Sequence, residues 1–179
     1  MSFSFYDTSV QSYLQILNGL IGVLDKGLGH AEETGLDLQE MVMTRLHEDM
    51  MPLHFQIISA VHHSLGAIQG MQQGSFSPPS FSLDMDYPSL RGLVFSARDT
   101  LAEYDPTVIE SLAEGEMVFK LGKNQIPFTN QHFLLSFSLP NFYFHATTSY
   151  SILRMLGVPL GKLDYVGQMK IGAASDSGI

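Results

Sequence analysis

Apolar side chains recur every three or four residues along four stretches of the chain, the spacing that gathers them on one face of an α-helix. The first stretch covers 6–28 and predicts a helix that ends near 34–35, where Thr is followed by Gly. The second covers 38–65, contains Pro52, and includes Asp49 among its core-facing positions. Because proline lacks a backbone N–H, we expect Pro52 to kink a long second helix.

The rest of the chain predicts two more helices and two connections. A third apolar stripe covers 90–104, and a fourth covers 130–157. The Ser- and Pro-rich stretch 74–88 is long enough to cross from one end of a bundle to the other. Apolar and polar residues alternate over 117–128, on both sides of a turn that contains glycine, which predicts a β-hairpin. We therefore expect an all-α four-helix bundle with one long crossover loop and a small β-hairpin before the last helix.

Length and composition narrow the classes of protein that this sequence fits. At 179 residues the chain suits a single domain, expected over 1–172, with a small polar tail at 173–179 that should be disordered. The absence of cysteine excludes disulfides and thiolate metal sites, so any metal ligand must be His, Asp, Glu, Asn or Gln. A net charge of −9 argues against nucleic acid and anionic membrane as partners. With no secretion signal or membrane span in its pattern, we expect a cytoplasmic protein.

Polar side chains interrupt the buried stripes at a few positions, and these define the candidate site. On the fourth helix Asn141, His145 and Thr148 lie on the face that is otherwise apolar. Asp49 interrupts the second stripe, and Gln56 follows it by seven residues on the same face. Since the two stripes must be buried together, we expect Asp49 to face His145. Three interpretations stay open, namely metal ligands, an acid–base pair, or hydrogen bonds that only stabilise the fold.

The other histidines of the second helix are less well placed on its apolar face. His54 lies off the centre of the stripe, and we include it as a further pocket residue. His47 also lies off the centre, while the adjacent His62 and His63 point about 100° apart. We expect these last three to be solvated or to flank the core.

Several motifs resemble those of a known superfamily. In the last helix of the DinB/YfiT-like proteins, two histidines four residues apart precede an L-R-x-L-G stretch and a proline-containing exit. His145 matches the second of these histidines, and Asn141 stands where the first would be. The matching strings are LRMLGVP at 153–159, RLxxDMxPLxxQ at 45–56, PNFYFH at 140–145 and GKxD at 161–164. Together they resemble an uncharacterised domain-of-unknown-function family within that superfamily.

The resemblance implies a function as well as a fold. Characterised relatives are metal-dependent thiol S-transferases and maleylpyruvate isomerase-like enzymes, in which three histidines bind a divalent ion. Here only His145 carries over, Asn141 replaces a second ligand, and Asp49 is placed third by its register alone. A divalent ion such as Zn or Ni would bind weakly, because an amide is a poorer ligand than imidazole. The alternative is a non-catalytic bundle whose former metal site is a structural hydrogen-bond network.

The fourth helix carries more aromatic side chains than one buried face requires. The run 142–144 surrounds the helix, and Phe133 and Phe137 precede it by one to two turns. Either the hairpin or a second copy of the chain should cover part of this surface. We therefore expect a homodimer; a small-molecule ligand is implied separately by the resemblance.

Overall fold

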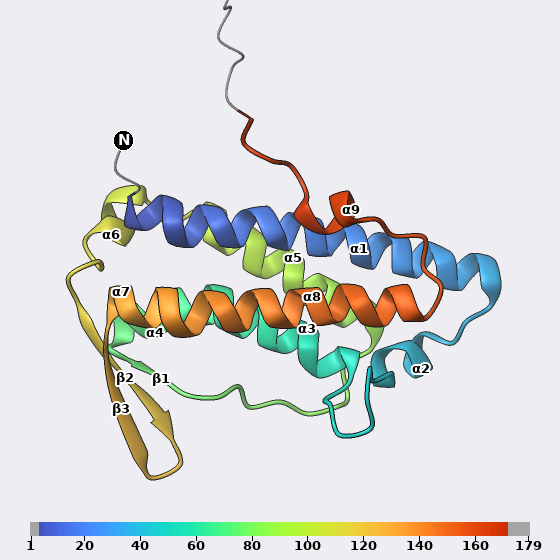
Figure 1. Ribbon diagram of the computed structural model, residues 1–179, viewed down its shortest axis with the longest axis horizontal. Helices are drawn as coiled ribbons and strands as arrows, with labels where there is room; N and C mark the ends of the chain where they lie inside the picture. The colour runs from blue at the N-terminus through green and yellow to red at the C-terminus, as the bar shows by residue number, and fades with distance from the viewer. Residues whose placement is uncertain (1–3, 172–179) are drawn as a thin grey trace, which may run out of the picture.

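The computed structural model describes residues 4–171 and consists mainly of helices that lie side by side, with a small sheet at one end (Figure 1). The tail predicted at 173–179 lies outside the described residues. Within 4–171 the long helical segments are η1–α1 (Asp7–Gln11 and Ser12–Thr34), α3–η2–α4 (Leu53–Val61, His62–Gly66 and Ala67–Gln73), α5 (Tyr87–Ala102) and α7–η3–α8 (Asn130–Phe133, Leu134–Ser138 and Leu139–Met155). The short helices are α2 (Leu38–Met43), α6 (Pro106–Glu110) and α9 (Lys162–Val166).

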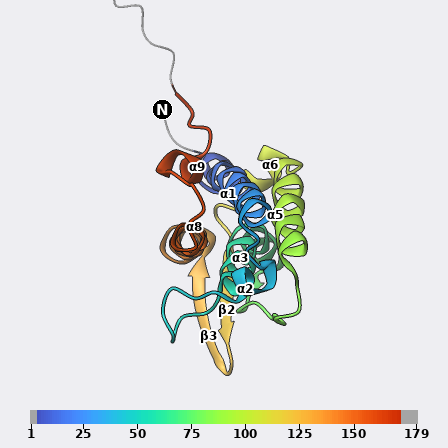
Figure 2. The same cartoon turned by 90° about the vertical axis from the view of Figure 1, so that its right-hand side faces the viewer.

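The long segments pack around one apolar core. The helix α3 packs against α8 and α5, while α1 packs against α5, α8 and α9. Figure 2 looks along these segments and shows them grouped about a common axis. The side chains that fill the space between them are fully buried and include Tyr13, Leu17, Leu20, Leu24, Leu53, Ile57, Leu90, Val94, Phe142 and Ile152. No helix among residues 4–171 is long and apolar enough to cross a bilayer.

The second helix is the main departure from the predicted elements. A kinked helix was expected over 38–65, but α2 ends at Met43 and α3 begins only at Leu53. Thr44 and Pro52 both have extended backbones, with ψ of 139° and 170°. Proline cannot donate to the helix ladder and disfavours a helical residue before it, so the chain leaves the helix instead of bending within it. The helical register that placed Asp49 on a core-facing stripe is therefore wrong.

The sheet contains the predicted hairpin and a third strand that the sequence pattern did not predict. Strands β2 (Glu116–Leu121) and β3 (Asn124–Thr129) pair antiparallel, and Gly122 has a φ of 59° at the first position of the two-residue turn, where a type II′ turn favours glycine. The strand β1 (Ser75–Phe76) pairs parallel to β2. Two residues are too few for an alternating pattern, but they bring Phe76 beside the helices.

Two π-helical turns face each other in the core, at η2 and η3. The Ser138 hydroxyl donates to the backbone carbonyl of His63 at 2.6 Å, so it accepts from the Tyr13 hydroxyl, also at 2.6 Å. A π-turn interrupts the regular ladder of helical hydrogen bonds, and such turns often occur at functional sites. This buried chain joins three segments and fixes His63 at the level of Ser138.

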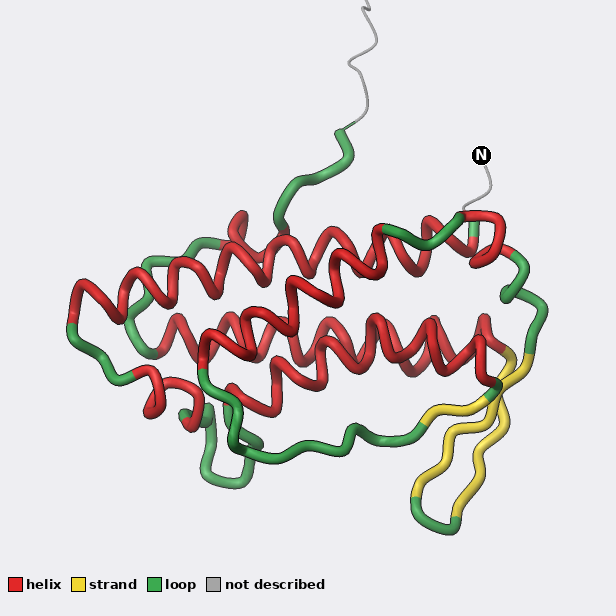
Figure 3. Tube along the Cα trace, turned by 180° about the vertical axis from the view of Figure 1, so that it is seen from behind, coloured by secondary structure: helices red, strands yellow, loops and turns green. Residues whose placement is uncertain are grey.

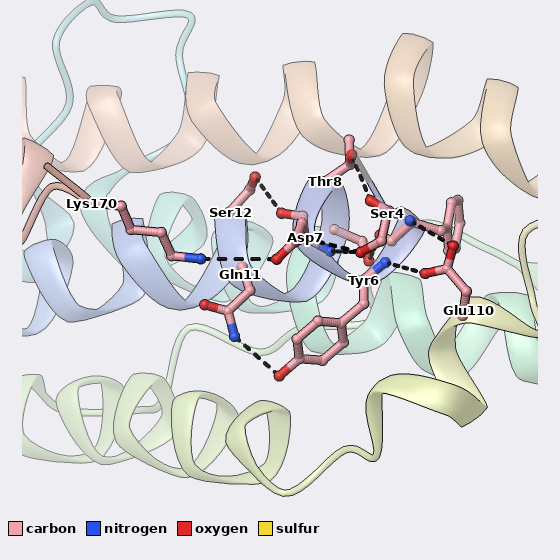
Figure 4. Close-up of polar contacts among 10 residues, drawn as sticks. Ser4, Tyr6, Asp7, Thr8, Gln11, Ser12, Glu110 and Lys170 are labelled. Carbon is pink, nitrogen blue, oxygen red and sulfur yellow. Dashed lines mark hydrogen bonds and ion pairs between the residues drawn. The ribbon is translucent and has the colours of Figure 1, made fainter. Parts of the chain in front are cut away.

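Polar contacts hold the beginning of the first helix against α6 (Figure 4). The carboxylate of Glu110 accepts from the backbone N–H groups of Phe5 and Tyr6, each at 3.1 Å. The first N–H groups of a helix have no partner inside it, so Glu110 supplies the cap from a distant part of the sequence. Asp7 lies 4.0 Å from Lys170, near the end of the described chain.

Candidate functional site

The candidate site lies where α3 and η2 face α8. Hydrogen bonds join Gln56 to His145 and Ser138 to His63, so the two segments run antiparallel. Helical side chains tilt toward the N-terminus of their own helix, which makes His63 and His145 lean toward each other. Their imidazole rings are nearly parallel, with an interplanar angle of 15° and 5.7 Å between centroids. Two imidazoles from different helices therefore form one pair, which we call the His63–His145 pair.

Gln56 orients one member of this pair. Its buried amide donates from Nε2 to the Met51 carbonyl at 2.9 Å, which identifies Oε1 as the acceptor at its other end. That oxygen lies 2.7 Å from His145 Nδ1, so Nδ1 carries the proton. In the neutral ring the other nitrogen, Nε2, then has a free lone pair.

Aromatic rings surround the pair, in which His63 is buried and His145 is half-buried. The centre of the His63 ring lies 5.5 to 5.6 Å from the ring centres of Phe76, Phe137 and His62. His63 is only 7% exposed. Phe55 and Phe144 lie 5.9 and 5.3 Å from the His145 ring. The His63 Nδ1 atom is buried without a hydrogen-bond partner among the described residues.

This environment keeps both imidazoles uncharged. Burial first, and then repulsion between like charges on His63 and the neighbouring His145 and His62, together lower the pKa of His63 to about 3. Burial lowers the pKa of His145 to about 4. Within residues 4–171 no three His, Asp or Glu side chains form a group that could hold a metal ion. At neutral pH both rings are therefore uncharged and can offer nitrogen lone pairs.

The sequence matches the DUF1993 family, a domain of unknown function, over residues 5–166. The chain belongs to the DUF1993 family. Its fold is similar to the crystal structure of a DinB family member from Shewanella denitrificans, with a TM-score of 0.78 and 25% identity over 94% of this chain and 95% of that one. No curated protein matches the sequence. These findings confirm the resemblance to an uncharacterised DinB/YfiT-like family that the motifs indicated.

The DUF1993 chain does not bring together the ligand set expected from its sequence. Asp49 lies in the loop before α3, with a side chain that is 81% exposed, and its carboxylate lies 2.6 Å from His47 Nδ1. The expectation that it faces His145 is wrong, because that stretch is not helical. Asn141 is half-buried and donates to the Phe137 carbonyl of its own helix at 2.7 Å.

The pocket residues expected from the sequence also separate into different places. Gln56 contacts His145 directly, as described above. Thr148 is buried, but its hydroxyl donates to the Phe144 carbonyl one turn earlier at 2.7 Å. His54 is fully buried with neither ring nitrogen hydrogen-bonded among the described residues; burial lowers its pKa, and the nearby Asp84 raises it.

His63 is the residue that sequence reasoning missed. The buried face of the predicted second helix was defined by an apolar stripe that included Asp49. The residues around Asp49 are not helical, so that face was assigned incorrectly beyond them. Counted from Gln56 instead, His63 follows by seven residues, which places both on one face after two turns. That spacing was the available signal.

Proposed function

We propose that this DUF1993 protein is a four-helix bundle of the DinB type that binds a divalent transition-metal ion weakly through His63 and His145. The observation that carries the proposal is the meeting of two neutral imidazoles from facing segments. Imidazole nitrogen is a good ligand for Zn²⁺ and Ni²⁺. The fold likeness to a DinB family member supports the same assignment.

The residues present fit a weak site. Metal ligation requires an unprotonated ring nitrogen, and the lowered pKa values of His63 and His145 provide this at neutral pH. Gln56 holds the His145 ring through Nδ1, the role that outer partners of metal-binding histidines usually have. Stable zinc sites use three or four protein ligands, whereas only two imidazoles meet here. The remaining ligands would be water or the Asn141 amide oxygen, both of which bind weakly.

The chemistry of such a centre follows from its surroundings. A bound divalent ion supplies a Lewis acid that polarises a substrate oxygen or activates a bound water or thiol. The chain itself keeps the two imidazoles neutral, orients His145 through Gln56, and packs Phe55 against the His145 ring. The resemblance to DinB/YfiT-like enzymes supports thiol transfer to, or isomerisation of, a small molecule as the proposed reaction class.

A metal-free structural role is the alternative, and one observation favours it. Both polar ends of Gln56 are already satisfied, by the Met51 carbonyl and by His145. Such a network stabilises the packing of α3 against α8 without any activity.

Metal titration of tag-free protein, by equilibrium dialysis against Zn²⁺ and Ni²⁺, separates the two roles. We expect substoichiometric metal as isolated and weak binding that falls about tenfold or more in His63→Ala and in His145→Ala. The exposed His132→Ala is the matched control and should bind as the unmodified protein does. Asn141→His should tighten binding, because it adds an imidazole four residues from His145. Tight stoichiometric zinc in the unmodified protein would contradict the weak site, and no binding at all would establish the structural role.

We further propose that the protein is a homodimer through α8. The hairpin covers part of the aromatic surface, since Phe137 packs on Phe119 at 4.7 Å and on Phe128 at 6.0 Å. Phe144 and Met155 nevertheless stay 55% and 53% exposed. A second copy would cover them by burying at least about 1,000 Å² in total. Sedimentation at micromolar protein should show a dimer that Phe144→Glu dissociates; a monomer in the unmodified protein would contradict the proposal.

A further inference from the structure

A groove with a volume of about 640 Å³ lies between α3–η2–α4 and the crossover that leads to α5. Figure 3 shows this crossover running alongside the helices from the sheet to the start of α5. Its apolar walls come from both sides and include Ile58, Val61, Leu65, Phe76, Phe81 and Leu93. Small-molecule sites in proteins have volumes of about 300 to 1,000 Å³ and mostly apolar linings, so the groove is of the right size and character.

The groove is uncharged. Its polar lining in the described structure consists of serines, His62, Gln69 and Gln73, with no Asp, Glu, Lys or Arg. A charged ligand placed there would lose part of its hydration without gaining an ionic partner, which disfavours its binding. The net charge of −9 opposes anions further. The lining therefore selects a neutral ligand.

His62 provides one directed polar contact in this lining. Its Nε2 atom lies 2.7 Å from the Ser77 carbonyl, which only accepts, so Nε2 carries the proton and Nδ1 has the lone pair. The ring stacks on Phe76 at 4.3 Å between centroids, which fixes its orientation. A Cβ at Gly66 would lie only 3.1 Å from Nδ1, so the glycine leaves open space beside the acceptor. Nδ1 makes no hydrogen bond within residues 4–171.

We propose that this groove binds a neutral amphipathic small molecule, whose apolar body lies along Ile58, Leu65 and Leu93 and whose N–H or O–H group donates to His62 Nδ1. Neither His63 nor His145 lines the groove, which adjoins the proposed metal centre through the ring contact of His62 with His63 at 5.6 Å.

A pair of fluorescent probes with one skeleton tests the charge selection on the full chain. N-phenyl-1-naphthylamine is uncharged and has one N–H donor, while 8-anilinonaphthalene-1-sulfonate adds a sulfonate. We expect the neutral probe to bind at least about tenfold more tightly, because the groove offers no cation. Equal or tighter binding of the sulfonate would overturn the assignment of a neutral ligand.

Substitutions then locate the site. Gln69→Trp places a large side chain on the exposed edge of the groove and should abolish binding of the neutral probe. Gln72→Trp, on the same helix but outside the lining, is the matched control and should bind the probe normally. His145→Ala should also bind it normally, whatever its effect on metal. If Gln69→Trp binds like the unmodified chain, the probe site lies elsewhere and the proposal fails.

The N-methylated form of the neutral probe, which has no N–H, tests the contact with His62. The unmodified chain should prefer the N–H probe by about 3- to 10-fold, the effect of one neutral hydrogen bond. His62→Phe keeps the stacking on Phe76 but removes Nδ1, and it should bind both probes equally. Discrimination that survives in a folded His62→Phe chain would overturn the role of His62. Probe binding that weakens as protein concentration rises would instead identify a second copy of the chain as the occupant.

Discussion

Two pairs of interacting side chains that include histidine lie in different environments. One pair is in the loop before α3, and the other is where η2 faces α8. In the loop, His47 and Asp49 lie 2.6 Å apart, and their side chains are 64% and 81% exposed. On the helical face, no Asp or Glu completes a group with the His63–His145 pair among residues 4–171, and aromatic rings pack around it. An exposed ion pair contributes about 0 to 1 kcal/mol, since water screens it and competes for both groups. A short distance between polar groups is therefore a weaker sign of a functional site than the removal of those groups from water.

The backbone accounts for this difference. The chain around Asp49 is a loop because the backbone at Pro52 is extended, and the Asp49 side chain therefore stays in water. The π-turns η2 and η3 place His63 against α8, where Ser138 satisfies its carbonyl. Desolvation then changes the chemistry of the imidazoles by lowering their pKa values.

Truncating a histidine in each environment should give the largest contrast. His63→Ala leaves a cavity among packed rings and should lower the free energy of unfolding by about 2 to 4 kcal/mol. His47→Ala removes an exposed side chain and should change it by less than about 0.5 kcal/mol. Urea unfolding of both variants measures the contrast, and equal losses would contradict the difference in burial.

Removing the polar partner of each pair should give a smaller contrast. Gln56→Leu leaves the His145 Nδ1 proton without its acceptor in a half-buried place, which should cost about 1 to 3 kcal/mol. Asp49→Ala removes only the exposed contact with His47, so we expect a loss within about 0.5 kcal/mol. The same unfolding measurement applies, and a Gln56→Leu protein as stable as Asp49→Ala would show that the Gln56 contact does not form.

The pH dependence of stability sharpens the comparison further. The folded pKa values of His63 and His145 lie below the value near 6.5 of an unfolded histidine, so the unfolded chain binds more protons in between. Stability from these groups is complete above about pH 6.5 and falls from there to about pH 4 for His145 and about pH 3 for His63, by at most about 1.4 kcal/mol per pH unit for each group. His63→Phe should reduce this slope. Phe119→Leu is the control, because it perturbs the same aromatic cluster without removing a titratable group. It should lower the free energy of unfolding and leave its dependence on pH unchanged. If His63→Phe also left this dependence unchanged, His63 would not be held neutral.

Much of the helical fold follows from the spacing of apolar residues. The periodic stripes predicted α1, α5 and the long final helix, because a helix that buries one face has apolar residues at every third or fourth position. The break before α3 was missed because the apolar residues of 38–65 continue the helical spacing across a loop. The spacing of apolar residues indicates which side chains are buried, but it does not indicate where a helix ends.

The candidate site was harder to predict than the fold for a related reason. His145 and Gln56 each stood on the buried face of its helix, and the structure places them in contact. His63 lies on the same face as Gln56 because it follows Gln56 by seven residues. It also lies in the π-turn η2, and no pattern in the sequence predicts a π-turn. The short strand β1, which brings Phe76 against His63, is also too brief to leave a pattern.

Residue-assigned NMR titration of the imidazole rings tests the His63–His145 pair most directly. Ring nitrogen and Cε1–H signals report the protonation and the tautomer of each histidine in the folded chain. We predict that His63 and His145 stay neutral from about pH 7.5 down to about pH 5, with the proton of His145 on Nδ1, where Gln56 accepts it. Titration of either ring near or above about pH 6.5, or an Nε2–H tautomer at His145, would contradict a buried neutral pair at this site.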